Sequence, residues 1–115
     1  MSTTTIAKRL IELCREGKFP QAQKELYADN STSIETDGSK RSGLEVLLIK
    51  EQKFLDSLEK IHRIEFSDPI VAGSYFSARL MMEIEIKNIG HKQFEELCIY
   101  RVLNDKVVSE QFFRD

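Results

Sequence analysis

The sequence predicts an α+β fold, because its hydrophobic period changes halfway along the chain. In the first half, apolar residues recur every three or four positions, as on one side of a helix, with one short strand between the helices. From Ile61 onward they alternate with polar residues, as in strands, and turn residues separate the runs. We therefore expect three N-terminal helices packed on a strongly bent, mostly antiparallel sheet. The expected domain spans residues 1–115 and is cone-shaped, with an internal pocket.

Two helices are expected before residue 30. The first follows the hydroxyl side chains of residues 3–5, which can cap a helix N-terminus. It ends at Gly17, because glycine adopts a left-handed conformation without a Cβ clash. Proline is tolerated in a first helical turn, so the second helix begins at Phe19-Pro20 and ends at residues 28–30. The apolar side of the first helix comprises Ile6, Leu10, Leu13 and Cys14.

A short strand and a third helix follow. Ser31–Thr36 is rich in β-branched and hydroxyl residues, which favours a strand. Asp37-Gly38-Ser39 predicts a turn, and the two basic residues after it extend a solvated loop. Ser42 and Glu45 have the spacing of a capping box, and the helix is expected to continue to about residue 60. Its apolar stripe consists of Leu44, Leu47, Leu48, Glu51, Phe54, Leu55 and Leu58.

The second half predicts four strands joined by turns. They are Ile61–Ser67, Ile70–Lys87, a strand from about Lys92 to Leu103, and Lys106–Phe113. Gly73 lies inside the longest strand and marks a bulge or bend. One face of that strand is expected to consist of Phe76, Ala78, Leu80, Met82, Ile84 and Ile86.

The opposite face of the sheet carries more aromatic surface than a fully solvated face would. A second copy of the sheet is the simplest cover, so we expect a two-fold homodimer. The residues expected in this interface are Tyr75, Met81, Phe94, Tyr100 and Phe113.

Composition excludes several classes of protein. The net charge of −2, with interspersed signs, gives no basic surface for nucleic acid or an anionic membrane. Cys14 and Cys98 are too few and too far apart for a disulfide framework or a zinc site. We expect no metal and no cofactor, since the histidines and acids lack ligand spacing and no phosphate-binding loop is present. The absence of a long apolar run predicts a cytoplasmic chain without a signal peptide or membrane span.

Two segments resemble a known superfamily. Tyr27–Glu35 (YADNSTSIE), followed by Gly38 and Arg41-Ser42-Gly43, resembles the first strand of NTF2-like proteins. Asp105–Phe113 resembles the last hairpin of the same proteins. This superfamily includes ketosteroid isomerase, the SnoaL polyketide cyclases and many SnoaL-like proteins. The resemblance covers nearly the whole chain in element order, and it implies fold more than activity because the fold hosts enzymes, carriers and transport adaptors.

The resemblance implies a catalytic position for one carboxylate. Glu35 occupies the place where ketosteroid isomerase holds its general base, which moves a proton between carbon atoms of an enolisable substrate. The tyrosine and the acid of the isomerase's oxyanion hole fall on Leu10 and Ile99. Neither side chain donates a hydrogen bond, and each lost donor costs about 3–4 kcal/mol of transition-state stabilisation. The chain is therefore not expected to be a ketosteroid isomerase.

The same register turns Glu110 toward the pocket as a second carboxylate. Two acids in a confined apolar pocket raise the pKa of at least one of them. Alternatively, Glu35 faces solvent at the end of a strand. For Glu110 there are two alternatives: it faces water while Gln111 and Phe113 point inward, or it forms an ion pair with Arg101. The remaining expected pocket residues are Leu10, Leu80, Met82, Ile84, Ile86, Leu97, Ile99, Val108 and Phe112.

Three functions stay open at this stage. The first is binding of a small hydrophobic molecule, which the missing donors at Leu10 and Ile99 favour. The second is an isomerase, cyclase or dehydratase acting on a carbonyl-containing hydrophobic substrate, with Glu35 as general base and Glu110 as acid or polar anchor. The third is a non-catalytic dimeric interaction module. A raised pKa on one of the two glutamates would favour catalysis.

Other side chains with possible chemistry have simpler interpretations. His62 could act as an acid–base group in the pocket, but an exposed or hydrogen-bonded histidine is favoured, and His91 lies in a turn. Tyr27 is expected to pack beneath the sheet, and the less favoured alternative is a phenol at the pocket wall. Cys98 has no basic neighbour to lower its pKa, so we expect it to be inert.

Overall fold

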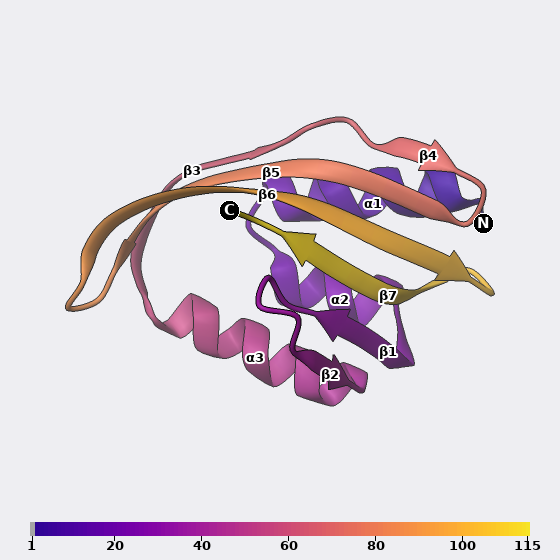
Figure 1. Cartoon of the computed structure of the whole chain (residues 1–115), viewed down its shortest axis with the longest axis horizontal. Coiled ribbons are helices and arrows are strands. Elements are labelled where there is room, and N and C mark those ends of the chain that lie inside the picture. Colours follow the sequence, from indigo (N-terminus) through magenta and orange to yellow (C-terminus); the bar gives the residue numbers. More distant parts are fainter. Residues whose placement is uncertain (1) are drawn as a thin grey trace.

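Three helices lie against one face of a strongly curved sheet in the computed structural model, which describes residues 2–115 (Figure 1). The helices are α1 (Thr3–Arg15), α2 (Phe19–Leu26) and α3 (Leu44–Asp56). The strands are β1 (Tyr27–Ile34), β2 (Lys40–Ser42), β3 (Leu58–Phe66), β4 (Ile70–Ala72), β5 (Tyr75–Ile86), β6 (Gly90–Leu103) and β7 (Lys106–Phe113).

The strand order along the sheet is β2-β1-β7-β6-β5-β3, and the short strand β4 pairs with β5. The first strand joins the last one in parallel, whereas the other pairs are antiparallel. The expectation of three helices on a bent, mostly antiparallel sheet is therefore confirmed. The long strands β5 and β6 curve over the helices and form the wall that bounds the interior (Figure 1).

The helix starts differ from the expected ones. Ser2 caps α1, and its Oγ accepts a hydrogen bond from the Thr5 backbone N–H at 3.1 Å. Helix α3 begins after Gly43, which has a φ of 98° and provides no side-chain cap. The capping box expected at Ser42 is wrong, because Ser42 belongs to β2 and pairs with Thr32 of β1. A left-handed conformation favours glycine, so Gly43 can link the edge strand to the helix.

Two other boundaries follow from strand pairing. Helix α3 ends at Asp56 and not near residue 60, because Leu58 already pairs with Ile86 of β5. Strand β1 begins at Tyr27, directly after α2, where the sequence predicted the end of a helix. Its parallel partner β7 extends the strand in this direction, since Tyr27 pairs with Val107. Tertiary pairing thus overrides the local preference of residues 28–30.

The expected long strand from residue 70 to 87 is divided in two. Gly73 has a φ of 60° and lies in a tight turn, and Ala72 pairs with Tyr75 across it. Strand β4 is therefore a short hairpin partner of β5 rather than its first part. The face of β5 that was expected to be apolar does point to the interior, where Phe76, Ala78, Leu80, Met82 and Ile84 are buried.

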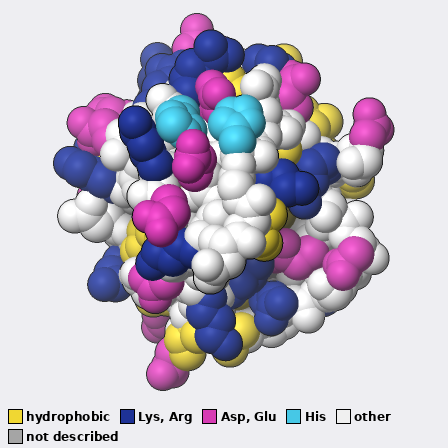
Figure 2. Space-filling model, turned by 90° about the vertical axis from the view of Figure 1, so that its left-hand side faces the viewer, with side chains coloured by type: hydrophobic (Ala, Val, Ile, Leu, Met, Phe, Trp, Pro, Cys, Tyr) yellow, Lys and Arg dark blue, Asp and Glu magenta, His cyan; other side chains and the backbone are white. Residues whose placement is uncertain are grey.

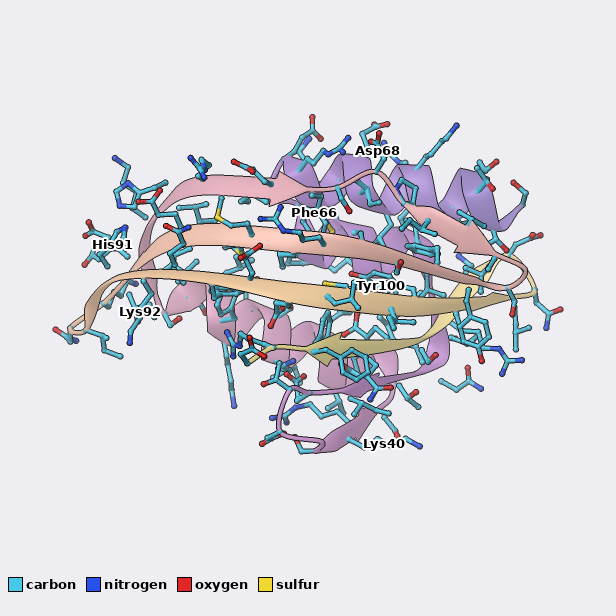
Figure 3. The ribbon with its side chains drawn as sticks, turned by 45° about the horizontal axis from the view of Figure 1, so that its top comes forward. Lys40, Phe66, Asp68, His91, Lys92 and Tyr100 are labelled. Atoms are coloured by element: carbon cyan, nitrogen blue, oxygen red, sulfur yellow. The ribbon has the colours of Figure 1, made fainter. Side chains whose placement is uncertain are left out.

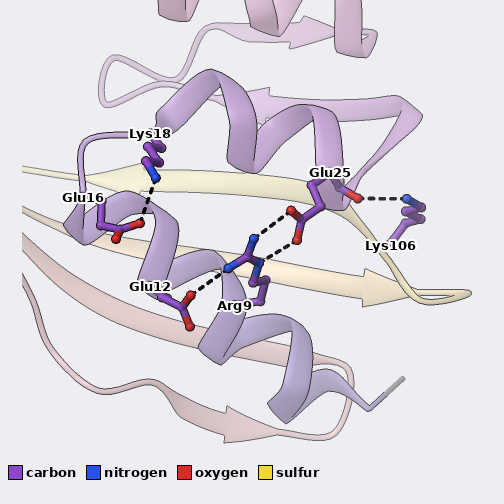
Figure 4. A network of polar contacts seen from close by, with 6 residues as sticks. All are labelled: Arg9, Glu12, Glu16, Lys18, Glu25 and Lys106. Carbon is purple, nitrogen blue, oxygen red and sulfur yellow. Dashed lines mark hydrogen bonds and ion pairs between the residues drawn. The ribbon is translucent and has the colours of Figure 1, made fainter.

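A surface ion pair joins α1 to α2, and a side-chain hydrogen bond joins α2 to β7 (Figure 4). Arg9 donates to the Glu25 carboxylate at 2.7 and 3.0 Å and to Glu12 at 2.7 Å. The Lys106 ammonium donates to the backbone carbonyl of Glu25 at 3.0 Å. These contacts are exposed and contribute little to the free energy of unfolding individually. They do fix α2 beside β7, which matters because both elements supply groups to the cavity described next.

None of the helices within residues 2–115 combines the length and the hydrophobicity needed to cross a bilayer.

Candidate functional site

A cavity of about 350 Å³ lies between the helices and the curved sheet. This volume is at the lower end of the range for small-molecule pockets. Its wall is mostly apolar and comes from all three helices and from β5, β6 and β7. The charged side chains that line it are Glu35, Glu51, Glu96, Glu110, Lys50, Lys92 and Arg114.

Most of the residues expected around the pocket line this cavity. The apolar ones are Leu10, Leu80, Met82, Ile84, Ile86 and Phe112. Both expected carboxylates, Glu35 and Glu110, line it as well, so they do not point to opposite faces of the sheet. The expectations for Leu97, Ile99 and Val108 differ from the structure.

Leu97 and Ile99 lie on the outer face of the sheet. They pair with Arg79 and Ser77 on the outward side of β5, and Leu97 is 45% exposed. The inward residues of this strand are Phe94, Glu96, Cys98 and Tyr100. Neighbouring residues of a strand face opposite sides of the sheet. On β6 both sets of alternating residues contain apolar side chains, so the sequence alone does not show which set faces inward.

The outward list for the dimer interface also changes. Phe94 and Tyr100 line the cavity and do not face outward, and Met81 is only 2% exposed. Val108 is displaced by a bulge in the β6–β7 pair: Val102 pairs with Val107, whereas Arg101 pairs with Ser109. The bulge places the Val107 side chain in the core and leaves Val108 half-buried.

Glu110 is held by two hydroxyl groups in the cavity wall. The Tyr27 phenol donates to Oε1, and the Ser33 hydroxyl donates to Oε2 at 2.7 Å. The parallel pairing of β1 and β7 explains this contact, since Ser33 and Glu110 are register partners. Burial raises the pKa of Glu110 above its ordinary value, while the two hydrogen bonds oppose the rise. Tyr27 is therefore part of the cavity wall and not only a packing residue.

Glu35 forms an ion pair with Lys50 at the cavity wall. Glu35 follows β1, and Lys50 lies on the side of α3 that faces it. The Lys50 ammonium also lies 5.8 Å from the centre of the Phe112 ring. The charge of Glu35 therefore already has a partner in the protein.

Glu51 is a cavity carboxylate that the sequence reasoning missed. It lies on α3 among apolar residues and has no hydrogen bond or ion pair within residues 2–115. Burial raises its pKa to about 7; the negative charge of Glu110 adds to the rise, and Lys50 opposes it. The signal was present in the sequence, because Glu51 interrupts the apolar stripe between Leu47 and Phe54.

Two further polar groups face the cavity from β6. Glu96 is partly buried, lies 3.8 Å from the Arg114 guanidinium, and has a pKa raised by burial. Tyr100 lies on β6 (Figure 3) and is buried. Its ring stacks on Phe76 with ring centres 4.7 Å apart. Burial raises the pKa of Tyr100 well above its ordinary value, so the phenol stays protonated and can donate a hydrogen bond. This donor was not expected, since Ile99 was placed inward in its stead.

The histidines lie outside the cavity, whereas both cysteines line it. His62 contacts Glu85 at 3.1 Å and His91 contacts Glu83 at 2.6 Å, with ring centres 5.8 Å apart on the molecular surface (Figure 2). Within residues 2–115, no group of three or more histidine, cysteine or acidic residues could hold a metal ion. Burial raises the pKa of Cys98 to about 12, so its thiol stays protonated at neutral pH.

Proteins of known structure share this fold. The model of the SnoaL-like domain family matches residues 1–114. A candidate SnoaL-like polyketide cyclase from Mesorhizobium loti is 27% identical, with a TM-score of 0.91 over 98% of this chain and 99% of that one. A protein of ketosteroid isomerase-like fold from Catenulispora acidiphila, solved with trimethylamine, is 16% identical, with a TM-score of 0.77 over 96% and 85% of the two chains.

An NTF2-like protein from Burkholderia pseudomallei is 14% identical, with a TM-score of 0.77 over 100% of this chain and 92% of that one. No curated protein matches the sequence. Because the family model covers nearly the whole chain, the chain belongs to the SnoaL-like domain family, and its fold is NTF2-like.

Proposed function

We propose that the chain binds a small, mostly apolar, carbonyl-containing molecule in the cavity and exchanges a proton with it at Glu51. The observation that carries this proposal is a carboxyl group without a partner in an apolar-walled cavity, with a pKa of about 7. A general base works best when its pKa lies near the operating pH. The similarity to a candidate polyketide cyclase supports a substrate that contains carbonyl groups.

Three carboxylates compete for the role of proton acceptor. Glu35 is paired with Lys50, and Glu110 accepts two hydrogen bonds, so both already have partners for their charge. Glu51 has none, and it keeps its oxygen atoms available to a bound molecule. We therefore assign the proton transfer to Glu51 and give Glu110 the role of a buried anchor whose charge raises the pKa of Glu51.

The proposed step is abstraction of a proton next to a carbonyl group. The C–H bond breaks, the proton moves to a carboxylate oxygen of Glu51, and the electron pair moves to the carbonyl oxygen to form an enolate. The neutral phenol of Tyr100 supplies a donor to that oxygen. Return of the proton to another atom of the same molecule completes an isomerisation.

Hydrogen–deuterium exchange of 2-tetralone in D2O tests the proposal directly. Proton NMR follows the loss of the signal next to the carbonyl group at pH 7.5, with and without protein. Exchange with the wild type is expected to be faster than in buffer alone. With E51Q, the catalysed exchange rate is expected to be about 100- to 10,000-fold lower than with the wild type. E35Q provides the matched comparison, because it removes the carboxylate that the sequence favoured.

Exchange that survives in E51Q and disappears in E35Q would return the role to Glu35. A wild-type rate equal to that of buffer would contradict the proposal that the chain transfers a proton. Thermal unfolding of each variant shows that the fold is retained.

The outer face of the sheet supports a second proposal, a homodimer. Tyr75, Leu97 and Phe113 are 47%, 45% and 46% exposed and lie on the adjacent strands β5, β6 and β7. Leu97 and Phe113 are direct partners across the β6–β7 pair. Exposed aromatic and aliphatic groups next to one another are typical of an interface. Light scattering after size-exclusion chromatography tests this proposal, and a monomer at 100 µM would contradict it.

A further inference from the structure

Gln23 is a buried polar side chain of the cavity that no part of the proposed proton transfer uses. It lies on α2, one helical turn before Tyr27, and it is only 6% exposed. Its side-chain carbonyl oxygen, Oε1, has no hydrogen-bond partner among residues 2–115. Most buried polar groups in folded proteins have such a partner, so each exception requires an explanation.

The position of Gln23 separates it from the other unpartnered groups. Ser31 Oγ and Arg101 Nε are also buried without a partner, but neither residue lines the cavity. Gln23 does line it, together with Tyr27 and Glu110, whose polar atoms are already bonded to each other. The carbonyl oxygen of Gln23 therefore lacks a partner in the protein, and a hydroxyl group in the cavity can become its partner once the side-chain amide turns toward it.

We propose that Gln23 is a ligand-binding subsite that accepts a hydrogen bond from a hydroxyl group. The ligand is then a small, mostly apolar molecule with at least one hydroxyl, such as a phenol or an enol. This inference rests on the proposed function, because it takes the same cavity as the binding site. The inference adds an orientation for the ligand: its hydroxyl group faces Gln23 on α2, and its carbonyl side faces Glu51 on α3.

The size of the cavity agrees with a ligand of one or two rings. Its volume of about 350 Å³ corresponds to roughly a dozen water molecules at about 30 Å³ each. The aromatic side chains in the wall suit a flat apolar body. They include Phe19, Phe54, Phe66, Phe94, Phe112 and Tyr100. Two-ring aromatic compounds that differ only in a hydroxyl group are therefore suitable probes.

Isothermal titration at pH 6 with 2-naphthol and 2-methoxynaphthalene tests the subsite. The two probes share the ring system, but only the first has a hydrogen to donate. The wild type is expected to bind 2-naphthol about three- to tenfold more tightly than the methyl ether. In Q23M, which keeps the side-chain length and removes the acceptor, this preference is expected to vanish while the ether binds at least as well.

Q21M is the matched control, since Gln21 lies on the exposed side of the same helix. It is expected to retain the wild-type preference. Q23M should also fold, because it removes a buried unpaired acceptor, and its Tm without probe is expected to be equal or higher. An equal preference in Q23M and the wild type would overturn the subsite, as would wild-type protein that binds both probes equally.

The outcomes also separate this inference from the proposed function. Binding of both probes with no role for Gln23 would overturn only the subsite. Failure of both probes to bind the wild type would overturn the subsite and also contradict the cavity as a binding site for small apolar molecules. The titration involves no proton transfer, so a lack of activity toward 2-tetralone leaves its result unchanged.

Discussion

Replacing Glu51 by glutamine is expected to stabilise the chain at alkaline pH and to have little effect at acidic pH. The pKa of Glu51 rises from an ordinary value of 4.5 to about 7 in the folded chain. The folded state therefore binds more protons than the unfolded state between these two values, and the stability linked to Glu51 is lost as pH rises through them. Glutamine never ionises, so E51Q avoids this loss.

The size of the effect follows from the two pKa values. From 4.5 to about 7, the linked free energy of unfolding amounts to about 3 kcal/mol, at about 1.4 kcal/mol per pH unit. For a domain of this length that corresponds to roughly 10 °C in Tm. Part of this free energy belongs to the coupling with Glu110, whose negative charge contributes to the raised pKa.

Urea unfolding of the wild type and E51Q at pH 4.5, 6, 7 and 8.5 measures the difference. We expect the two proteins to agree at pH 4.5 and E51Q to be more stable by about 3 kcal/mol at pH 8.5. E59Q is the control, because Glu59 is an exposed carboxylate on the neighbouring strand β3; its effect should stay within about 0.5 kcal/mol. A difference between the wild type and E51Q that does not change with pH would show that the pKa of Glu51 is the same in the folded and the unfolded chain.

Three further predictions concern other parts of the molecule. Y27F removes one of the two donors to Glu110 and is expected to cost about 1–3 kcal/mol in urea unfolding at pH 7; an unchanged free energy would show that this hydrogen bond adds nothing. The Cys98 thiol, with a pKa of about 12, is expected to resist a thiol reagent at pH 8 until the chain is unfolded; rapid labelling of the native chain would contradict its burial. L97E, on the exposed outer face, is expected to convert a dimer into a monomer in light scattering, whereas an unchanged dimer would place the interface elsewhere.

The order of the elements was predictable because it depends on local patterns. Helical and strand periods, turn residues and glycines are local signals, and they agree with one another along most of the chain. Boundaries set by pairing between distant segments were not predictable in this way. Tyr27 belongs to β1 because it pairs with Val107 of β7. Ser42 belongs to β2 because it pairs with Thr32 of β1.

The facing of β6 shows where alternation stops being informative. Leu97 and Ile99 are as apolar as Cys98 and Tyr100, so hydrophobicity alone assigns neither pair to the interior. Glu96 lies in the inward set, although a carboxylate there argues against burial on sequence grounds. The resemblance to NTF2-like proteins identified the fold, but it did not fix this register.

The candidate site was predictable only in part. Glu35 and Glu110 were placed around the cavity correctly, because their positions follow from β1 and β7. Glu51 was included in an apolar stripe and its charge was not used, although a carboxylate at such a position is unusual enough to mark a site. Gln23 carried no signal at all, since a single glutamine on a short helix is ordinary.

A carbon-13 NMR titration of the glutamate side-chain carboxyl groups, with the Glu51 signal assigned from its loss in E51Q, measures the pKa on which the proposed proton transfer depends. We expect a midpoint near pH 7 for Glu51, because burial and the charge of Glu110 raise this pKa. A midpoint near 4.5, the ordinary value for glutamate, would show that Glu51 is well solvated, and it would contradict the proposal that this residue exchanges a proton inside the cavity.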